Sequence, residues 1–427
     1  MLLCLAAELL VVGGIIYRIN HSKRDWVRQT RVLNFLSIIL VATVLYTWAS
    51  TQINFENVQA SSNPDNINIG EDGQLTRLQP VNIIDEHLPD IYYIILDGYG
   101  RSDILDEIYK LNNGEFLSYL ESKGFFVAEE SNSNYPRTGL SFASSLNSTY
   151  LDGISQQLGE ESENLLPLKS FIENSFVFQQ LRQAGYKIIT FPSGYELTEI
   201  SSSDQIISFQ TTPGSFQNLL INNTPLSIFL LGKQYDWHRQ RITFNINQLP
   251  EVSNQDQPTF VFAHILAPHP PFVFGSNGES IYPSRKYGID DGNEFLAVAN
   301  REEYLNGYRD QLVYINGQII NSIERIMATS STQPVIIIQG DHGPRSSYEP
   351  EILEGEKLVE RMAILNAYLL PGIDPNMLYP GITPVNTFRL LFNAYLGTNY
   401  PLLEDRSYYS PNDRPFQFTD VTGMLDK

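Results

Sequence analysis

Short unbroken runs of apolar residues recur in the chain after residue 88, and three of them cover residues 91–96, 258–263 and 335–338. Such a run, flanked by turn-forming residues, is typical of a parallel strand buried on both faces. Segments with apolar residues at helical spacing alternate with the runs. Helices are expected at 105–123, 175–185, 302–328 and 387–396, and further strands at 124–127, 186–190 and 362–370. The alternation predicts an α/β fold with a mostly parallel sheet sandwiched by helices, and a right-handed parallel crossover from the first strand to 124–127.

Two apolar segments lie close to the amino terminus. Residues 1–16 are apolar except for Glu8, and residues 32–50 form a longer run without charge. About 20 apolar residues cross a bilayer. The segment between them, 18–31, is rich in Lys and Arg, and positively charged loops stay in the cytoplasm. We therefore expect two transmembrane helices in residues 1–50, joined by a short basic cytoplasmic loop.

Alternatives to two retained spans are a cleaved signal peptide or a buried helical hairpin. The charges of a signal peptide precede its apolar core, whereas here they follow the first apolar segment. Residues 51–88 are dominated by Asn, Asp, Ser and Gln, which predicts a solvated linker. Residues 89–427 are then an extracytoplasmic domain of a multi-pass protein of the cell membrane.

The charge and the cysteine count exclude several classes of function. The 427-residue chain carries a formal charge of −20, and because residues 1–31 contribute +3, the remainder carries −23. So acidic a body is a poor nucleic-acid binder, and we expect no nucleic-acid partner. Cys4 is the only cysteine, which excludes disulfides within the chain and metal sites built from several cysteines.

Polar side chains follow two of the apolar runs. Asp341 and His342 come just after residues 335–338, and Asp97 comes directly after residues 91–96. Open α/β sheets place their sites at this carboxyl edge. A carboxylate oxygen and an imidazole nitrogen suit zinc or manganese. The alternative interpretation is a pair of ordinary turns, with Asp97 capping the segment that follows.

A helix is expected to begin near Thr138, because Leu140 and Phe142 follow it among other apolar residues. Backbone N–H groups and the helix dipole stabilise negative charge at such a position. A hydroxyl there is a candidate nucleophile for an attack on phosphorus. The alternative is that Thr138 only caps the helix.

His264 and His269 lie close together, and Pro268, Pro270 and Pro271 restrict the loop around His269. Imidazoles held at the end of a strand suit phosphate contact, proton transfer or metal ligation. The alternative is that one histidine packs against the prolines while the other bonds to the backbone.

Four stretches of the chain, taken in order, resemble the alkaline phosphatase/sulfatase superfamily: YYIILDGYG (92–100), NYPRTGLSFASSLN (134–147), HILAPHPPF (264–272) and IIIQGDHG (336–343). The similarity is greatest to the membrane-anchored sulfatase-like branch that includes lipoteichoic acid synthases and phosphoglycerol transferases. It implies an alkaline phosphatase-like fold for the catalytic domain.

The resemblance also implies roles for individual residues. Asp97, Asp341 and His342 become metal ligands, Thr138 becomes the nucleophile and a further ligand, and His269 contacts the substrate phosphate, with His264 as a second substrate-binding candidate. Ser141 is the alternative nucleophile. The resemblance implies one divalent metal ion, Mn²⁺ or Zn²⁺, and leaves a second metal open. The Cys/Ser-x-Pro-x-Arg motif of sulfatases that use formylglycine is not matched, since Pro136 stands one place late.

The function expected from these features is that of a metal-dependent sulfatase-like hydrolase, or of a phosphoryl- or phosphoglycerol-type transferase. Its substrate would be a membrane lipid or a cell-envelope phosphoester or sulfate ester. Two alternatives stay open: a catalytically inactive domain that binds an envelope glycan or a protein, and a sulfatase that uses an unmodified hydroxyl.

Overall fold

The computed structural model describes residues 78–81 and 88–425, except 210–212, 223–225, 253–255, 290 and 348–353, and scattered residues between 17 and 42. The expected spans in residues 1–50 and the linker at 51–88 lie mostly outside the described residues. Within the described part of the chain, no helix has both the length and the apolar character that crossing a bilayer requires. The chain divides into two compact units, Met1–Asn63 and Pro64–Lys427, and the sheet belongs to the second.

One seven-stranded sheet organises the described part of the second unit, with the strand order β2-β7-β6-β1-β5-β3-β4. The strands are β1 Ile91–Leu96, β2 Phe126–Val127, β3 Lys187–Phe191, β4 Gln205–Ile206, β5 Thr259–Ile265, β6 Val335–Gln339 and β7 Asn366–Leu369. β1 lies at the centre and pairs in parallel with β5 and β6, so Ile95 stands beside both His264 and Gln339. The carboxyl ends of these three strands therefore meet at one edge.

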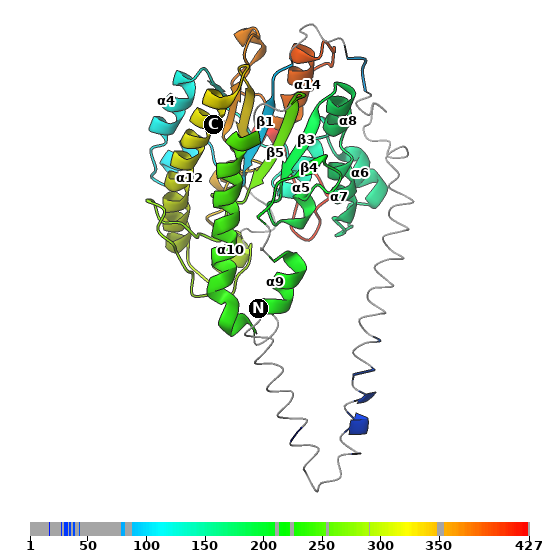
Figure 1. Ribbon diagram of the computed structural model, residues 1–427, viewed down its shortest axis with the longest axis vertical. Helices are drawn as coiled ribbons and strands as arrows, with labels where there is room; N and C mark the ends of the chain where they lie inside the picture. The colour runs from blue at the N-terminus through cyan, green and yellow to red at the C-terminus, as the bar shows by residue number, and fades with distance from the viewer. Residues whose placement is uncertain are drawn as a thin grey trace. The chain divides into compact units, whose positions relative to one another are not determined.

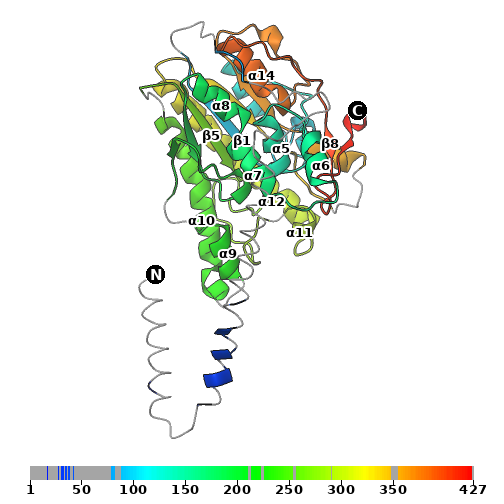
Figure 2. The ribbon, with the colours of Figure 1, turned by 90° about the vertical axis from the view of Figure 1, so that its right-hand side faces the viewer.

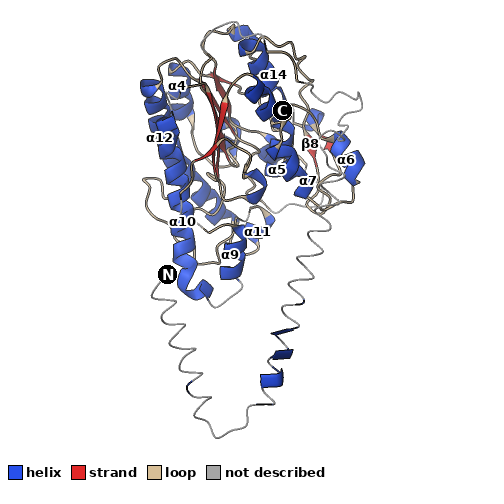
Figure 3. Cartoon of the chain, turned by 45° about the vertical axis from the view of Figure 1, so that its right-hand side comes forward, coloured by secondary structure: helices blue, strands red, loops and turns tan. Residues whose placement is uncertain are grey.

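Helices cover both faces of the sheet (Figures 1 and 3). Ile94 and Leu96 face the core under α4 Gly114–Ser122, α10 Leu226–Gln248 and α12 Arg301–Thr329. Tyr93 and Ile95 face the opposite core, under α5 Thr138–Ser145, α7 Leu166–Glu173, α8 Phe176–Gln183 and α14 Pro384–Tyr395. Alternate strand residues thus serve two cores, which explains why the central runs are apolar throughout. The expected α/β fold, with a mostly parallel sheet flanked by helices, is confirmed.

The remaining elements surround this sandwich. They are α3 Ser102–Glu107, α6 Asp152–Leu158, α9 Ser215–Asn222, α11 Asn293–Leu296, α13 Glu356–Met362, and a small antiparallel pair of strands, β8 Tyr408–Tyr409 and β9 Thr419–Asp420. The long helix α12 begins where Asn300 caps it, because its side-chain oxygen accepts the N–H of Glu303 at 2.9 Å.

One expectation about secondary structure was wrong, and another was met by a strand that is not adjacent to β1. The single helix expected at 105–123 is divided into α3 and α4, because Lys110 adopts a positive φ of 52° and the Asn112 side chain accepts the N–H of Gly114. Such local bonding competes with the helical pattern. The strand expected at 124–127 is the short edge strand β2, which pairs antiparallel with β7. Because β7 is itself antiparallel to β6, β2 runs parallel to β1 in the same sheet, as a parallel crossover requires. A two-residue strand carries too little pattern to specify its partner.

Candidate active site

Asp97 and Asp341 lie side by side because their strands do. Asp97 follows β1 directly, Asp341 follows β6 after one glycine, and the N–H of Gly98 donates to Oδ1 of Asp341 at 3.0 Å. A Cβ atom at Gly340 would lie 2.5 Å from the carbonyl oxygen of Tyr99, so only glycine allows the two turns to approach this closely. The expected convergence of these carboxylates is present in the structure.

Each of these carboxylates is buried and presents one oxygen without a hydrogen-bond partner among the described residues. Asp97 is 2 % exposed and Asp341 is 4 % exposed, and the unpartnered atoms are Oδ1 of Asp97 and Oδ2 of Asp341. Leaving such an atom buried costs free energy unless a cation or another donor satisfies it. Two buried oxygens of this kind next to imidazole nitrogens fit a divalent cation.

The unprotonated nitrogen of His342, Nε2, lies close to the same two carboxylates. Its Nδ1–H donates to the carbonyl of Gly343 at 3.0 Å, so in the neutral ring Nε2 carries the lone pair. Nε2 lies 3.3 Å from Oδ2 of Asp341 and 3.8 Å from Oδ1 of Asp97. Burial, together with the nearby Arg361, lowers the pKa of His342 to about 4. The ring is therefore neutral near pH 7, which is the form that binds metal.

Thr138 is the first residue of α5 and faces His342. Its Oγ1 lies 3.1 Å from His342 Nε2. The helix is preceded by Arg137 in the N-cap position, so Thr138 does not serve as the cap. Ser141 lies one turn on, and its Oγ is directed at the backbone carbonyls of Tyr135 and Asp341, at 2.9 and 2.6 Å. Of the two hydroxyls, only that of Thr138 lies beside the imidazole.

His264 lies behind Asp97, inside β5, and is fully buried. Its Nε2 is 3.0 Å from Oδ2 of Asp97, and its Nδ1 is 2.8 Å from Oγ1 of Thr198. A nitrogen of His264 and oxygens of Asp97 and Asp341 also lie within 4.8 Å of one another, so His264 is a second candidate for the nitrogen ligand. His342 is the other candidate, because its Nε2 faces the Thr138 hydroxyl in the cavity, whereas Nε2 of His264 faces Asp97. His264 lies behind Asp97, so it is better placed to orient this carboxylate than to contact the substrate.

His269 lies at the border of the same site, between two acidic side chains. Its Nδ1–H donates to the carbonyl of Pro270 at 2.6 Å, and its Nε2 is 3.9 Å from Oδ2 of Asp291. Burial lowers the pKa of His269, but Asp97 and Asp291 outweigh it, and the pKa rises above its ordinary value. For Asp97 burial acts in the opposite direction and raises the pKa. The nearby His269, His264 and His342 outweigh burial, and the pKa of Asp97 falls below its ordinary value.

Arg361, on α13, was not predicted from the sequence. Its Nε donates to the carbonyl of Pro136 at 2.7 Å, and its Nη1 donates to Oδ2 of Asp291 at 2.8 Å. Its Nη2 points to His342 Nε2, at 3.3 Å. Arg361 therefore brings a fixed positive charge next to the imidazole, where a group with negative charge would be stabilised.

A cavity of about 360 Å³ opens over these residues. Thr138, His269 and His342 line it together with three arginines, Arg137, Arg345 and Arg361. Leu165, Leu197 and Ile289 form an apolar wall on the cavity. Asp97, Asp291 and Glu294 complete the charged part of the lining, so the cavity combines arginines, carboxylates and apolar side chains, which suits an ester that carries a charged group and a less polar alcohol.

Sequence reasoning missed Asp291 and Arg361 because both reach the site through tertiary structure. Arg361 lies on a short helix without a motif, and Asp291 lies in a polar loop, so neither follows an apolar strand. The only local indication of the role of Arg361 is its position just before the apolar residues that lead from α13 into β7.

Comparisons with known proteins were consistent with the fold. The Sulfatase family model matches residues 89–388. Among solved structures, the C-terminal periplasmic domain of EptC from Escherichia coli in complex with zinc matches with a TM-score of 0.52 and 14 % identity, covering 81 % of this chain and 96 % of that chain. No curated protein sequence matches the chain.

Two further structures match with lower scores. One is the integral membrane protein lipooligosaccharide phosphoethanolamine transferase A from Neisseria meningitidis, with a TM-score of 0.49, 13 % identity, and coverage of 89 % of this chain and 72 % of that chain. The other is a 2-O GAG sulfatase, with a TM-score of 0.47, 13 % identity, and coverage of 74 % and 72 %. Because the family model spans most of the chain, and the resemblance found in the sequence agrees with it, the chain belongs to the Sulfatase family.

Proposed function

We propose that this protein is a metal-dependent phosphoester hydrolase or transferase in which Thr138 is the nucleophile. Enzymes of the Sulfatase family act on sulfate or phosphate esters. The observation that carries the proposal is the position of Thr138 Oγ1, 3.1 Å from the bare nitrogen of His342 and next to two buried carboxylates with unpartnered oxygens. Asp97, Asp341 and His342 would hold one divalent cation, with Thr138 as a further ligand.

Zn²⁺ or Mn²⁺ bound there would lower the pKa of the Thr138 hydroxyl and neutralise charge on the reacting phosphate. With Nε2 of His342 bound to the cation, the Thr138 oxygen 3.1 Å from it would be held by the cation itself, and Asp97 is in turn fixed by His264. The non-bridging oxygens of the substrate would lie among Arg361, His269 and the N-terminus of α5.

In the first step Thr138 gives its hydroxyl proton to solvent, to be regained when Thr138 is released, while its Oγ1 forms a bond to phosphorus and the bond from phosphorus to the leaving alcohol breaks. His269 would donate the proton that the leaving oxygen requires, since Asp97 and Asp291 favour its protonated form. Water or a second alcohol then attacks phosphorus, Thr138 is released, and the attacking group returns a proton to His269. The acceptor decides between hydrolysis and transfer.

A phosphoester fits this site better than chemistry through formylglycine. Formylglycine is made from cysteine or serine, and the position next to His342 is occupied by a threonine. Cys4, the only cysteine, lies in the apolar segment at the amino terminus. Direct attack by a threonine hydroxyl is the chemistry that remains for these residues.

The substrate proposed for this site is a phosphoester of a membrane lipid or of the cell envelope. The apolar segments 1–16 and 32–50 would anchor the protein in the membrane, with residues 51–88 as a linker and 89–427 as the extracytoplasmic catalytic domain. The Escherichia coli structure is a periplasmic domain that contains zinc, which makes Zn²⁺ the first ion to test here.

The test is turnover by the purified full chain in detergent, with Zn²⁺ or Mn²⁺ and bis-p-nitrophenyl phosphate. Thr138→Ala should abolish metal-dependent turnover, a loss of at least about 10³-fold, while Thr138→Ser keeps part of it. Ser141→Ala is the matched control, and it should retain turnover.

Three outcomes would contradict the proposal. Wild-type rates in Thr138→Ala would exclude Thr138 as the nucleophile. No turnover together with no bound metal would favour a binding domain. Turnover of p-nitrophenyl sulfate alone would favour a sulfatase that uses an unmodified hydroxyl.

A further inference from the structure

Helix α10 extends well beyond the edge of the sheet that carries the candidate site. Nδ2 of Asn245 donates to the carbonyl of Pro192, and Nη1 of Arg241 donates to the carbonyl of Ser193, the two residues that follow β3. Residues before Arg241 therefore project past the carboxyl edge. At 1.5 Å per residue, Phe229 lies about 18 Å further along the helix than Arg241. Figures 1 and 2 show α9 and the start of α10 extending away from the sheet.

The projecting end is apolar and partly exposed. Phe229 is 78 % exposed, the highest value among the large hydrophobic side chains that the structure describes. The sequence from 215 to 232, which covers α9 and the first turns of α10, contains no charged residue. A single exposed apolar side chain is ordinary on a protein surface, so the inference needs further exposed apolar residues close to Phe229.

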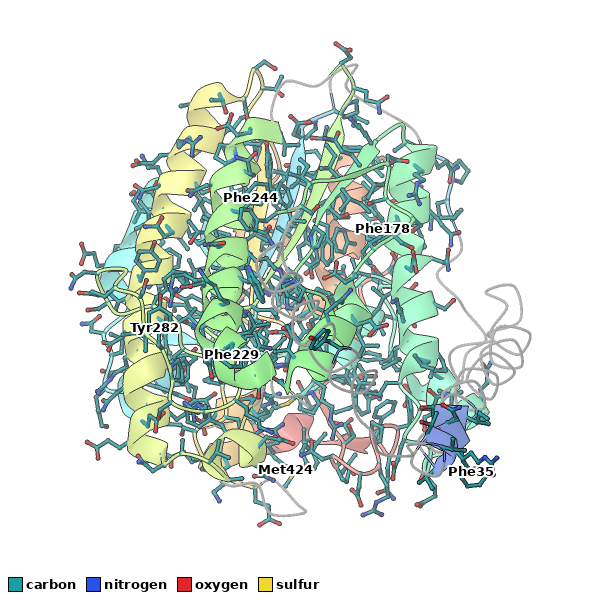
Figure 4. The ribbon with its side chains drawn as sticks, turned by 60° about the horizontal axis from the view of Figure 1, so that its bottom comes forward. Phe35, Phe178, Phe229, Phe244, Tyr282 and Met424 are labelled. Carbon is teal, nitrogen blue, oxygen red and sulfur yellow. The ribbon has the colours of Figure 1, made fainter. Side chains whose placement is uncertain are left out.

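A loop adds a second exposed apolar pair next to α10. Ile281 is 41 % exposed and Tyr282 is 54 % exposed. The Tyr282 hydroxyl donates to Oδ1 of Asp236 at 2.7 Å, and the Arg239 guanidinium lies 4.8 Å from the Tyr282 ring centroid. Phe229 and Asp236 are seven residues apart and thus share one face of the helix. Figure 4 looks onto this end of the domain, with Phe229 and Tyr282 labelled.

The charge around this end has the opposite sign to the rest of the protein. Residues 215–248 carry a net charge of +2 in a chain of −20, and in the loop Arg285 is paired with Glu303. Lys233 and Lys286 are exposed. Apolar and aromatic side chains next to exposed lysines are typical of segments that bind the headgroup region of anionic membranes.

We infer that the start of α10 and the loop at 280–287 form a surface that docks on the headgroup region of an anionic lipid bilayer. The inference rests on the membrane anchoring proposed above, since the predicted spans would keep a bilayer within reach of the linker. Docking by this end turns the carboxyl edge of the sheet, and with it the cavity over Thr138, toward the membrane. The surface would thereby present the site to an ester that stays in the bilayer.

The test uses the full chain in nanodiscs of phosphatidylcholine and phosphatidylglycerol, with Cys4→Ser as background. A single cysteine at Phe229→Cys carries an environment-sensitive nitrobenzoxadiazole label. The matched control is Thr332→Cys, because Thr332 is exposed and lies just before β6, at the opposite edge of the sheet. Thermal unfolding of both variants should match that of the background protein.

The label at 229 should shift to shorter emission wavelength and lose most of its intensity to lipids with a doxyl group near the top of the acyl chain. The label at 332 should do neither. Equal, water-like emission at both positions would overturn the inference. A wavelength shift at 229 without quenching by doxyl lipids would also overturn it, because the label would then be covered by protein. The measurement does not depend on turnover, so it stands apart from a failure of the proposed chemistry.

Discussion

At the scale of the residue, the backbone carbonyl of Gly343 determines which nitrogen of His342 carries the proton. Because Nδ1–H donates to this carbonyl, Nε2 is unprotonated, and it lies next to Thr138 and the two carboxylates. His264 stands one step further away, behind Asp97. We propose that His342 binds the metal and that His264 only orients Asp97. Replacing each histidine should therefore reduce metal affinity by a different amount.

We predict that His342→Ala abolishes tight Zn²⁺ binding, while His264→Gln weakens it by about 10- to 100-fold, as is usual when a residue that only orients a ligand is changed. Isothermal titration of the metal-free full chain measures both affinities. If instead His264→Gln loses the metal and His342→Ala keeps it, His264 is the ligand and the assignment of His342 is wrong.

Arg361 donates to the carbonyls of Pro136 and Gly343 and to Oδ2 of Asp291, and the same planar group lies next to the His342 imidazole. A lysine cannot reproduce this fork. Arg361→Lys should therefore lower kcat/KM for the model diester by about 10²-fold, the usual loss for one donor to a developing charge. Arg325→Lys is the control, because Arg325 is an exposed residue that pairs with Glu251 on the surface. Unchanged kcat/KM in Arg361→Lys would remove Arg361 from the site.

At the scale of the element, the turn after β6 is tightly enclosed. A Cβ atom at Gly343 would overlap the carbonyl oxygen of Glu360 and lie 2.8 Å from that of Ala363. Gly317, in α12, has nothing within 4 Å of the same position. The two glycines thus give a matched pair of substitutions with opposite expected effects.

Gly343→Ala should lower the free energy of unfolding by about 2 kcal/mol or more, because backbone must move to admit the methyl group. Gly317→Ala should raise it by about 0.5–1 kcal/mol through better helix propensity. Urea unfolding followed by circular dichroism compares them. A Gly343→Ala protein as stable as the wild type would mean that the turn is looser than described.

The strands that the sequence predicted well are those marked by an unbroken run of apolar residues. The apolar runs of β1, β5 and β6 are buried on both faces, so pattern alone located them and the polar residues at their ends. Helices α9 and α10 were not recognised, because 201–241 mixes polar and aromatic residues without a clear period. Arg361 and Asp291 were missed for another reason: their roles depend on α13 and a loop folding back over β6, which no local pattern records.

At the scale of the whole molecule, buried histidines link stability to pH. Burial, together with the nearby Arg241, lowers the pKa of His238 to about 3. The unfolded chain binds this proton near pH 6.5, so between these values the unfolded state takes up a proton that the folded state does not. The free energy of unfolding should therefore fall as the pH drops from about 6.5 toward 3, and this contribution is complete above pH 6.5.

His238→Gln should make that fall shallower, because glutamine does not titrate. Urea unfolding of the wild type and the variant at pH 7.5, 6, 5 and 4 gives the two slopes. The difference between them isolates His238 from the carboxylates, whose contribution is common to both proteins. Parallel curves would show that His238 keeps its proton in the folded state.

The parallel strands of this molecule direct their carboxyl ends to one edge, where the carboxylates, the imidazole and the threonine meet. The central claim is that Thr138 itself carries the transferred group. The most direct measurement is peptide mass spectrometry of the full chain, quenched in acid during turnover of bis-p-nitrophenyl phosphate with Zn²⁺. The account predicts a phosphoryl-ester adduct on Thr138. An adduct on Ser141, or steady turnover with no adduct on any residue, would contradict it.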